Sequence, residues 1–264
     1  MGEHKLKKPP RGPKIAARVM VATPTYTGDV VHECAMSMQI ATVHCLMRGV
    51  ALDWVFAAGC SLVQLARDWL HAEFLARTEC THLLWLDADL SFMPDAIMRM
   101  LCRNLDVVAG VYTTKSPTNP VFPYESLGPA KEGLQLARKI PGGFILVKRA
   151  VAQAVADSAE TYLLTHNEQT RESAHIFEVP LIESEKDPTK KVMLGEDYVY
   201  CHHLQTLGYK IAVETDIGFA HVGRNAWHGN LAKTLEDEAA RGFSGQGSNE
   251  AHQINQQRQQ SAAA

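Results

Sequence analysis

Two aspartates separated by one residue, Asp87 and Asp89, are the strongest candidates for chemistry in the sequence. They follow the apolar run at 83–86, a pattern typical of a strand that is buried on both faces. On an extended chain alternate side chains point the same way, so we expect both carboxylates to project from the strand's carboxyl end. Two like charges this close repel unless a cation lies between them, and hard oxygen ligands favour Mg²⁺ or Mn²⁺. The stretch therefore predicts a site for a metal-bound diphosphate.

Three further positions carry side chains that could act with this pair. Glu196 and Asp197 stand at the expected start of a helix, where the helix dipole favours carboxylates. His221 follows a late apolar segment and could complete a metal shell. Each also has a plain structural explanation, as a helix-start pair or as a surface histidine, so it is their combination that indicates a site.

The first half of the chain alternates apolar strand patterns with helical patterns. This alternation predicts a parallel sheet covered by helices on both faces. A polar loop at 23–29 follows the first strand, at the end of the sheet where open α/β folds bind ligands. The expected strands are 15–22, 50–56, 83–86 and 106–112, and the expected helices are 30–48, 62–77 and 94–103.

The second half has long polar segments between its elements. The stretches 113–133 and 161–194 lack periodicity and are predicted to be loops, which at this length are usually functional or disordered. Gly142 and Gly143 indicate a backbone that another molecule or strand approaches closely. The expected strands are 134–140, 145–147 and 209–213, and the expected helices are 149–160, 195–207 and 231–241.

Composition places the chain among ordinary globular proteins. Its 264 residues are 46% hydrophobic and 21% charged, and a net charge of −3 gives no general attraction to nucleic acid or anionic membranes. The six cysteines form no C-x-x-C pair, so neither a zinc site nor a disulfide framework is indicated. No uncharged run reaches the roughly 20 residues that span a bilayer, and we expect a cytoplasmic protein.

Taken in order, these segments resemble the GT-A glycosyltransferases, most closely the family-2-like bacterial and phage members. The resemblance runs from about Ala17 to Gly223 and implies an α/β fold of GT-A type. Such a fold has a Rossmann-like, open, mostly parallel sheet with helices on both faces, plus acceptor-side loops. The segments that carry it are Thr23-Pro24-Thr25-Tyr26, Ala66-Arg67, Leu86-Asp87-Ala88-Asp89, Pro141-Gly142-Gly143-Phe144, Gly195-Glu196-Asp197-Tyr198 and His221-Val222-Gly223.

The resemblance also implies roles for these residues. Asp87, Asp89 and His221 would hold Mn²⁺ or Mg²⁺, and Asp197 would be the general base beside Glu196. The acceptor-side segment would be Gly142, Gly143 and Phe144. The expected donor-binding residues are Thr23, Pro24, Thr25, Tyr26, Asp53, Arg67 and Asp87. This chain has Asp68 where the family has asparagine, so only Arg67 is carried over from that motif.

We expect one catalytic domain at 15–241, with a nucleotide-binding half at 15–112 and an acceptor half at 113–230. A flexible basic arm at 1–14 and a disordered tail at 242–264 would flank it. The expected activity is metal-dependent transfer of a sugar from a nucleotide sugar to an acceptor hydroxyl. UDP as the nucleotide follows only from the resemblance. Inversion, with Asp197 as base, is the expected stereochemistry, and a retaining mechanism stays open.

Two other functions remain open from the sequence. The D-A-D-L-S segment is similar to that of haloacid-dehalogenase-type phosphatases, although this chain has Ser91 where that group has threonine or valine. A non-catalytic nucleotide-sugar-binding module is the second alternative. The sequence also leaves open the acceptor, which could be a saccharide, a lipid-linked sugar, a protein or a modified nucleic-acid base, and the oligomeric state.

Overall fold

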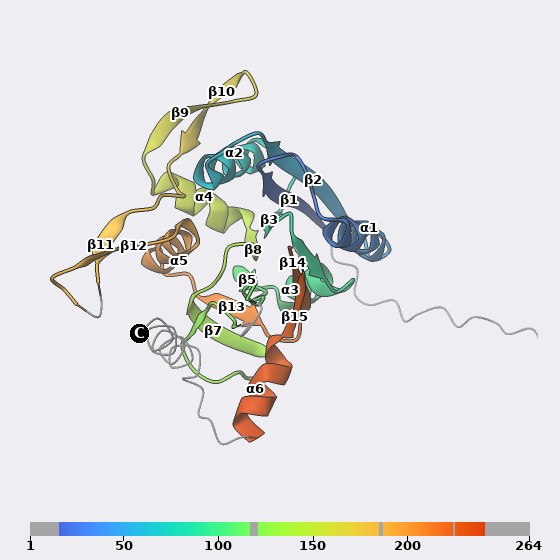
Figure 1. The fold of residues 1–264 in the computed structure, drawn as a ribbon. Coiled ribbons are helices and arrows are strands. Elements are labelled where there is room, and N and C mark those ends of the chain that lie inside the picture. The colour runs from blue at the N-terminus through green and yellow to red at the C-terminus, as the bar shows by residue number, and fades with distance from the viewer. Residues whose placement is uncertain (1–15, 117–120, 185–186, 224, 241–264) are drawn as a thin grey trace, which may run out of the picture.

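An eight-stranded sheet lies at the centre of the computed structural model, which describes residues 16–116, 121–184, 187–223 and 225–240 (Figure 1). Its strands are β1 (Ala17–Thr25), β2 (Val50–Ala58), β3 (His82–Leu86), β5 (Val107–Ala109), β6 (Glu125–Ser126), β7 (Leu134–Lys139), β8 (Phe144–Lys148) and β13 (Ile211–Glu214). They are ordered β2-β1-β3-β8-β5-β13-β7-β6, and β7 and β8 run against the others. The expected fold class, an open and mostly parallel Rossmann-like sheet, is confirmed.

Helices cover both faces of this sheet, as the alternating pattern predicts. Helices α1 (His32–Leu46) and α3 (Ala96–Arg103) pack on one face, where their apolar residues join those of the strands. Helices α2 (Val63–Ala76), α4 (Arg149–Asp157) and α5 (Glu196–Thr206) pack on the other. Strand β3 shows why both faces are apolar. Leu83 and Trp85 pack with the apolar residues of α2, α4 and α5, whereas Leu84 packs with those of α1 and α3.

Three smaller sheets complete the fold. Strand β4 (Leu90–Phe92) pairs with β14 (Gly218–Val222), which pairs with β15 (Ala226–Asn230), and α6 (Leu231–Ala240) follows. Two hairpins project from the body in Figure 1: β9 (Thr161–His166) with β10 (Gln169–Ala174), and β11 (Leu181–Glu183) with β12 (Lys191–Met193).

These small sheets correct two expectations. The stretch 161–194 is not one long loop, because it contains both hairpins. The turn of the first hairpin has Asn167 and Glu168 at φ of 46° and 63°, the left-handed conformations that a tight hairpin turn requires. Residues 90–92 form a strand, and the helix begins at Ala96 rather than at 94. The expected arm at 1–14 and tail at 242–264 lie outside the described residues.

His71 on α2 gives the fold a testable pH dependence. Its side chain is buried beside the Trp85 ring, and its Nε2 has no hydrogen-bond partner among the described residues. Burial lowers the pKa of His71 to about 4. In the unfolded chain the histidine has its ordinary pKa of about 6.5, so the unfolded state takes up a proton before the folded state does. The folded state therefore loses stability as the pH falls from about 6.5 towards 4.

We therefore expect the His71→Leu variant to lose less stability on acidification than the wild type, by about 2 kcal/mol between pH 7 and pH 5. Urea unfolding at both pH values measures the difference. His202→Leu, which replaces an exposed histidine on another helix, is the control and should keep the wild-type dependence. An unchanged pH dependence in His71→Leu would show that this histidine does not titrate as its burial requires.

Candidate active site

Arg67 is the centre of the candidate site. It lies on α2 near the carboxyl end of β3, and its side chain is almost wholly buried. Its Nη2 donates a hydrogen bond to Asp87 Oδ1 at 3.2 Å, and its Nη1 donates to the carbonyl oxygen of Gly142 at 3.2 Å. Nη1 also lies 3.2 Å from Asp197 Oδ1. One guanidinium therefore joins two of the predicted carboxylates to the predicted glycine segment.

The surroundings of Arg67 keep it charged. Burial disfavours the guanidinium, but the negative charges of Asp197 and Asp87 outweigh burial and raise the pKa of Arg67. The rings of Trp85 and Phe177 lie 5.8 Å and 5.6 Å from its Cζ, within the range of cation–π attraction. The site thus contains a fixed positive charge with little access to solvent.

Asp197 stands in the first turn of α5, next to Glu196. Burial raises the pKa of its carboxyl group, and the nearby charge of Asp87 adds to this, while Arg67 acts in the opposite direction. About a quarter of the side chain (27%) stays accessible to solvent. A carboxylate with a raised pKa that remains reachable is suited to accept a proton near neutral pH.

Gly142 and Gly143 leave the space that these carboxylates occupy. A Cβ atom on Gly142 would lie 2.6 Å from Asp197 Cγ, and one on Gly143 would lie 2.6 Å from Asp87 Cγ. The glycines are therefore required because side chains of the site itself pack against the backbone. The sequence predicted a close approach here, and the approaching groups are Asp87 and Asp197.

Tyr112 holds the second oxygen of Asp87, a contact that the sequence did not predict. Its hydroxyl donates to Asp87 Oδ2 at 3.1 Å and accepts a hydrogen bond from the Gly143 N–H at 3.0 Å. Burial raises the pKa of Tyr112 well above its ordinary value, so the phenol keeps its proton. Asp87 is consequently fixed through both carboxylate oxygens, by Arg67 and by Tyr112.

Asp89 has a different set of partners. Residues 88–89 form a turn and not an extended strand end, so our reason for expecting parallel carboxylates is wrong. Asp89 Oδ2 is paired with Lys115 Nζ, and Asp89 Oδ1 lies 3.6 Å from His221 Nε2. Burial opposes its ionisation, but these contacts outweigh burial and lower the pKa of Asp89.

The hydrogen bond on the other side of the His221 ring fixes which nitrogen faces Asp89. His221 Nδ1 lies 2.8 Å from the carbonyl oxygen of Thr113. A carbonyl can only accept, so Nδ1 carries a proton, and Nε2 is the nitrogen that would be left to bind a metal ion. Asp89 and His221 therefore offer one oxygen and one nitrogen ligand at a spacing that a divalent ion, about 2.1 Å from each, can bridge.

A cavity of about 440 Å³ joins the predicted donor loop to the predicted metal residues. The aromatic ring of Tyr26 is largely exposed at the loop, while Asp87 and Asp89, directly after β3, form the acidic wall. The residues that line the cavity and that the sequence had singled out are Pro24, Thr25, Tyr26, Asp87, Asp89 and His221. Arg67 contacts Asp87 from behind this wall.

Asp53 is not brought to this cluster. Both its oxygens accept hydrogen bonds from Arg18, at 2.7 Å and 3.1 Å, and this contact lowers the pKa of Asp53. Its register partner in β1 is Met20, whereas Thr25 at the cavity pairs with Ala58. The sequence correctly predicted that Asp53 lies in a strand, which is β2. Its pairing with Met20 shows that it lies in the first half of that strand, away from the carboxyl end where the cavity is.

Two other predicted residues are buried instead of lining the cavity. Phe144 is wholly inaccessible and packs between the rings of Phe92 and Phe219, each 5.0 Å away. Its expected contact with an acceptor is wrong, because the ring belongs to the core under α3. Thr23 is also fully buried, so its side chain does not face the cavity although the three residues after it do.

Asp87, Asp89 and His221 do not bring three ligand atoms within 4.8 Å of one another, and among the described residues only Asp53, Glu79 and Cys80 form such a group. It is a poor candidate for a metal site. The Asp53 carboxylate is already paired with Arg18, and burial with the neighbouring carboxylate raises the pKa of the Cys80 thiol to about 11. A protonated thiol is not a metal ligand.

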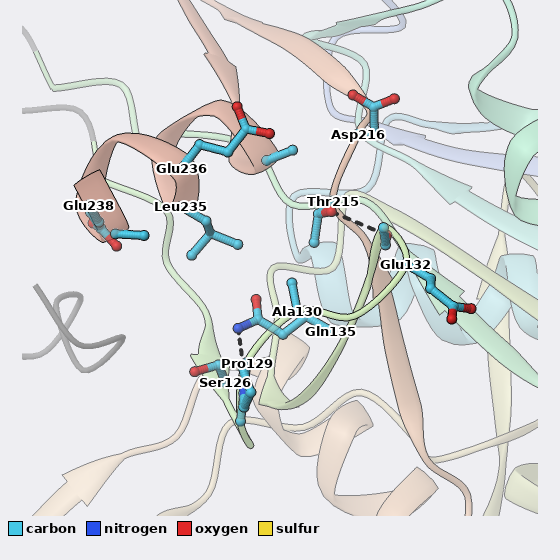
Figure 2. A pocket seen from close by; sticks show the side chains of 14 residues that line it. Ser126, Pro129, Ala130, Glu132, Gln135, Thr215, Asp216, Leu235, Glu236 and Glu238 are labelled. Atoms are coloured by element: carbon cyan, nitrogen blue, oxygen red, sulfur yellow. Dashed lines mark hydrogen bonds between the residues drawn. The ribbon is translucent and has the colours of Figure 1, made fainter. Parts of the chain in front are cut away.

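A second, wider cavity lies elsewhere, between α6 and the segment around β6 and β7 (Figure 2). Its volume is about 1110 Å³, and Figure 2 shows acidic side chains such as Glu132, Glu236 and Glu238 around it. None of the residues that the sequence singled out lines this cavity. Size alone therefore does not mark the candidate active site.

Within the described parts of the chain, every helix is too short or too polar to cross a membrane. This agrees with the hydropathy of the sequence.

Comparison with known proteins supports the fold. No family model and no curated protein matches the sequence. The crystal structure of A197 from STIV is 14% identical and matches 78% of this chain and 86% of its own, with a TM-score of 0.50. A glycosyltransferase involved in the glycosylation of the major capsid of PBCV-1 is 10% identical over 51% of this chain and 62% of its own, with a TM-score of 0.32. UDP-glucose pyrophosphorylase in its apo form is 7% identical over 86% and 81%, with a TM-score of 0.35. At these identities the chain shares its α/β fold with A197.

Proposed function

We propose that this chain is a metal-dependent glycosyltransferase that takes a sugar from a nucleotide-sugar donor. The observation that carries the proposal is the cavity that joins the loop after β1 to Asp87, Asp89 and His221. This arrangement gives one wall to a nucleoside and the other to a cation-bound diphosphate. The order of the motifs, which resembles that of GT-A glycosyltransferases, agrees with it.

The donor would lie along the cavity between these two walls. The exposed ring of Tyr26 offers a stacking surface for the base, with Pro24 and Thr25 beside it. Asp89 and His221 would hold Mn²⁺ or Mg²⁺, with Asp87 beside them. The ion would stabilise the negative charge that develops on the leaving diphosphate. UDP is the proposed nucleotide on the strength of the resemblance.

Lys115 adds a positive charge at the same place. Its ammonium group is paired with Asp89, and about a third of its side chain (32%) is accessible. A lysine ammonium group beside the expected diphosphate would neutralise phosphate oxygens. The buried Arg67 would act on the site by fixing Asp87 and Asp197.

Asp197 would act as the base that takes the proton of the attacking hydroxyl. Arg67 holds Asp197 Oδ1 in place, and burial raises the pKa of its carboxyl group. A positioned base typically contributes about 10²–10⁴-fold to the rate. Attack from the face opposite the diphosphate would invert the configuration of the sugar.

The phosphatase alternative requires one of the aspartates to attack phosphorus directly. Asp87 would be that nucleophile by its place in the motif, but both its oxygens are engaged by Arg67 and Tyr112. Hydrogen bonds to both oxygens make a carboxylate a weaker nucleophile. We therefore do not propose a phosphatase.

The proposal predicts that Mn²⁺ strengthens the binding of UDP by about tenfold or more, as measured by isothermal titration calorimetry. Asp89→Ala should abolish the effect of the metal, because it removes an anionic ligand beside His221. Asp106→Ala, which replaces an exposed aspartate paired with Lys148, is the control and should respond to Mn²⁺ as the wild type does. Equal UDP affinity with and without Mn²⁺ in the wild type would contradict the proposal.

A further inference from the structure

Lys115 is the cation that neutralises Asp89 in the free protein. Its ammonium group contacts Asp89 Oδ2, while the other oxygen of the same carboxylate lies 3.6 Å from His221 Nε2. The two oxygens belong to one small group, so an ion held between Asp89 and His221 would have the ammonium group as its near neighbour. Two cations this close in a partly buried site repel each other strongly. Lys115 and a divalent ion therefore compete for Asp89.

The backbone around Lys115 directs its side chain to this place. Two residues earlier, the carbonyl oxygen of Thr113 accepts the hydrogen bond from His221 Nδ1 at 2.8 Å, so one short segment holds the histidine and carries the lysine. The stem of Lys115 lies against Gly223, where an added Cβ atom would come within 3.3 Å of Lys115 Cδ. The absence of a side chain at Gly223 leaves the path along which the lysine reaches Asp89.

The ion pair has little value for the stability of the fold. Lys115 and Asp89 keep 32% and 34% of their side-chain surface accessible, and ion pairs with this degree of exposure contribute little to stability. The lysine is also free to change partner, because its charge sits at the end of a flexible four-carbon stem. The contact can therefore be exchanged for another anion at small cost.

The free site is incomplete for a divalent ion. Asp87 is held by Arg67 and Tyr112, and among the described residues Asp87, Asp89 and His221 do not form a group of three converging ligand atoms. Mg²⁺ and ions like it take about six ligands, several of which come from the phosphates of a bound nucleotide. A diphosphate thus offers oxygens that both the ion and the lysine lack in the free protein.

We propose that Lys115 blocks Asp89 to the divalent ion until a nucleoside diphosphate takes over its ammonium group. The inference rests on the proposed function and adds the residue that couples the metal to the donor. When the diphosphate binds, Lys115 exchanges the Asp89 carboxylate for a phosphate oxygen, and Asp89 becomes available as a metal ligand. Metal and nucleotide then bind as a pair, and each strengthens the binding of the other by the same factor.

The binding of Mn²⁺ alone, measured from the electron paramagnetic resonance signal of the free ion, tests the proposal. Lys115→Met keeps the length of the stem and removes its charge, so this variant should bind Mn²⁺ alone about tenfold or more tightly than the wild type does. In calorimetry, UDP without metal should bind the variant about tenfold more weakly, because a charged contact with phosphate is lost. Opposite changes for the two ligands are not what a general loss of structure produces.

Lys148→Met is the matched control. Lys148 also pairs with an aspartate, Asp106, and 30% of its side chain is accessible, but it lies outside the candidate site. This variant should bind Mn²⁺ and UDP as the wild type does. Circular dichroism and thermal unfolding establish that both variants fold.

The same titrations with and without UDP separate the inference from the proposed function. UDP should raise the Mn²⁺ affinity of the wild type, and in Lys115→Met this gain should be smaller by about tenfold or more. If UDP raises the wild-type affinity but Lys115→Met binds Mn²⁺ alone as weakly as the wild type does, only the inference is overturned. If UDP leaves the wild-type affinity unchanged, the proposed function fails and the inference fails with it.

Discussion

The Asp197→Asn variant is expected to bind the donor almost as the wild type does and to transfer sugar about 10²–10⁴-fold more slowly. Asparagine keeps the size and shape of the side chain but cannot accept a proton. Donor binding should survive because Arg67 retains its contacts with Asp87 and Gly142. Single-turnover transfer rates together with calorimetric UDP affinity separate the two effects.

Glu196→Gln is the matched control for this experiment. Glu196 is the neighbouring carboxylate in the first turn of α5. Replacing it with glutamine removes one negative charge from the same helix end. We expect a milder effect if Glu196 serves the helix end or the orientation of the acceptor. An Asp197→Asn enzyme that transfers sugar at nearly the wild-type rate would refute the base assignment and favour a retaining mechanism.

Gly143→Ala is expected to have the second large effect, on both stability and transfer. The added methyl group would overlap the Asp87 carboxylate and the Tyr112 hydroxyl, two groups that Arg67 and the Gly143 N–H hold in place. Overpacking of this kind typically costs about 1–3 kcal/mol of stability. Displacing Asp87 by about 1 Å should lower the transfer rate by roughly 10²-fold.

Thermal unfolding and initial-rate measurements on the same preparation test this expectation. Gly195→Ala is the control, because its φ is −66° and nothing lies within 4 Å of the position that a Cβ would take. It should keep wild-type stability and activity. A Gly143→Ala enzyme with wild-type stability and rate would mean that Asp87 can move freely, contrary to the packing described above.

Local sequence patterns predicted the parts of the site that lie on regular elements. The apolar run before Asp87 indicates β3, and its carboxyl end indicates where Asp87 and Asp89 emerge. The loop after β1 is placed at the same end of the sheet by its parallel pairing with β3. Tyr26 and Asp89 line one cavity with His221, which lies in a different sheet and was joined to them by the resemblance.

Contacts that depend on the strand order could not be predicted. Tyr112 and Lys115 follow β5, and only the insertion of β8 between β3 and β5 brings that region to the glycines and aspartates. Nothing in the residues around Lys115 indicates an acidic partner 26 positions earlier. The same reason explains the error at Asp53, since the strand was predicted but the register was not.

Asp68, where the GT-A pattern has asparagine, has a structural role in this chain. Its carboxylate accepts hydrogen bonds from the backbone N–H groups of Ile176 and Phe177 and from the Tyr162 hydroxyl. Burial raises the pKa of Asp68. These contacts fix the segment that follows the β9–β10 hairpin, including the Phe177 ring over Arg67. The sequence pattern predicted a loop at these residues, so the hairpin and its contacts with Asp68 could not be predicted from it.

The most direct test of the central claim is a turnover assay with a panel of nucleotide sugars, with and without Mn²⁺. We predict metal-dependent release of a nucleoside diphosphate from at least one donor, by slow hydrolysis without an acceptor, and loss of this release in Asp89→Ala. Release of phosphate from simple monoesters would instead indicate a phosphatase. Absence of turnover with every donor would contradict the account and leave a binding module.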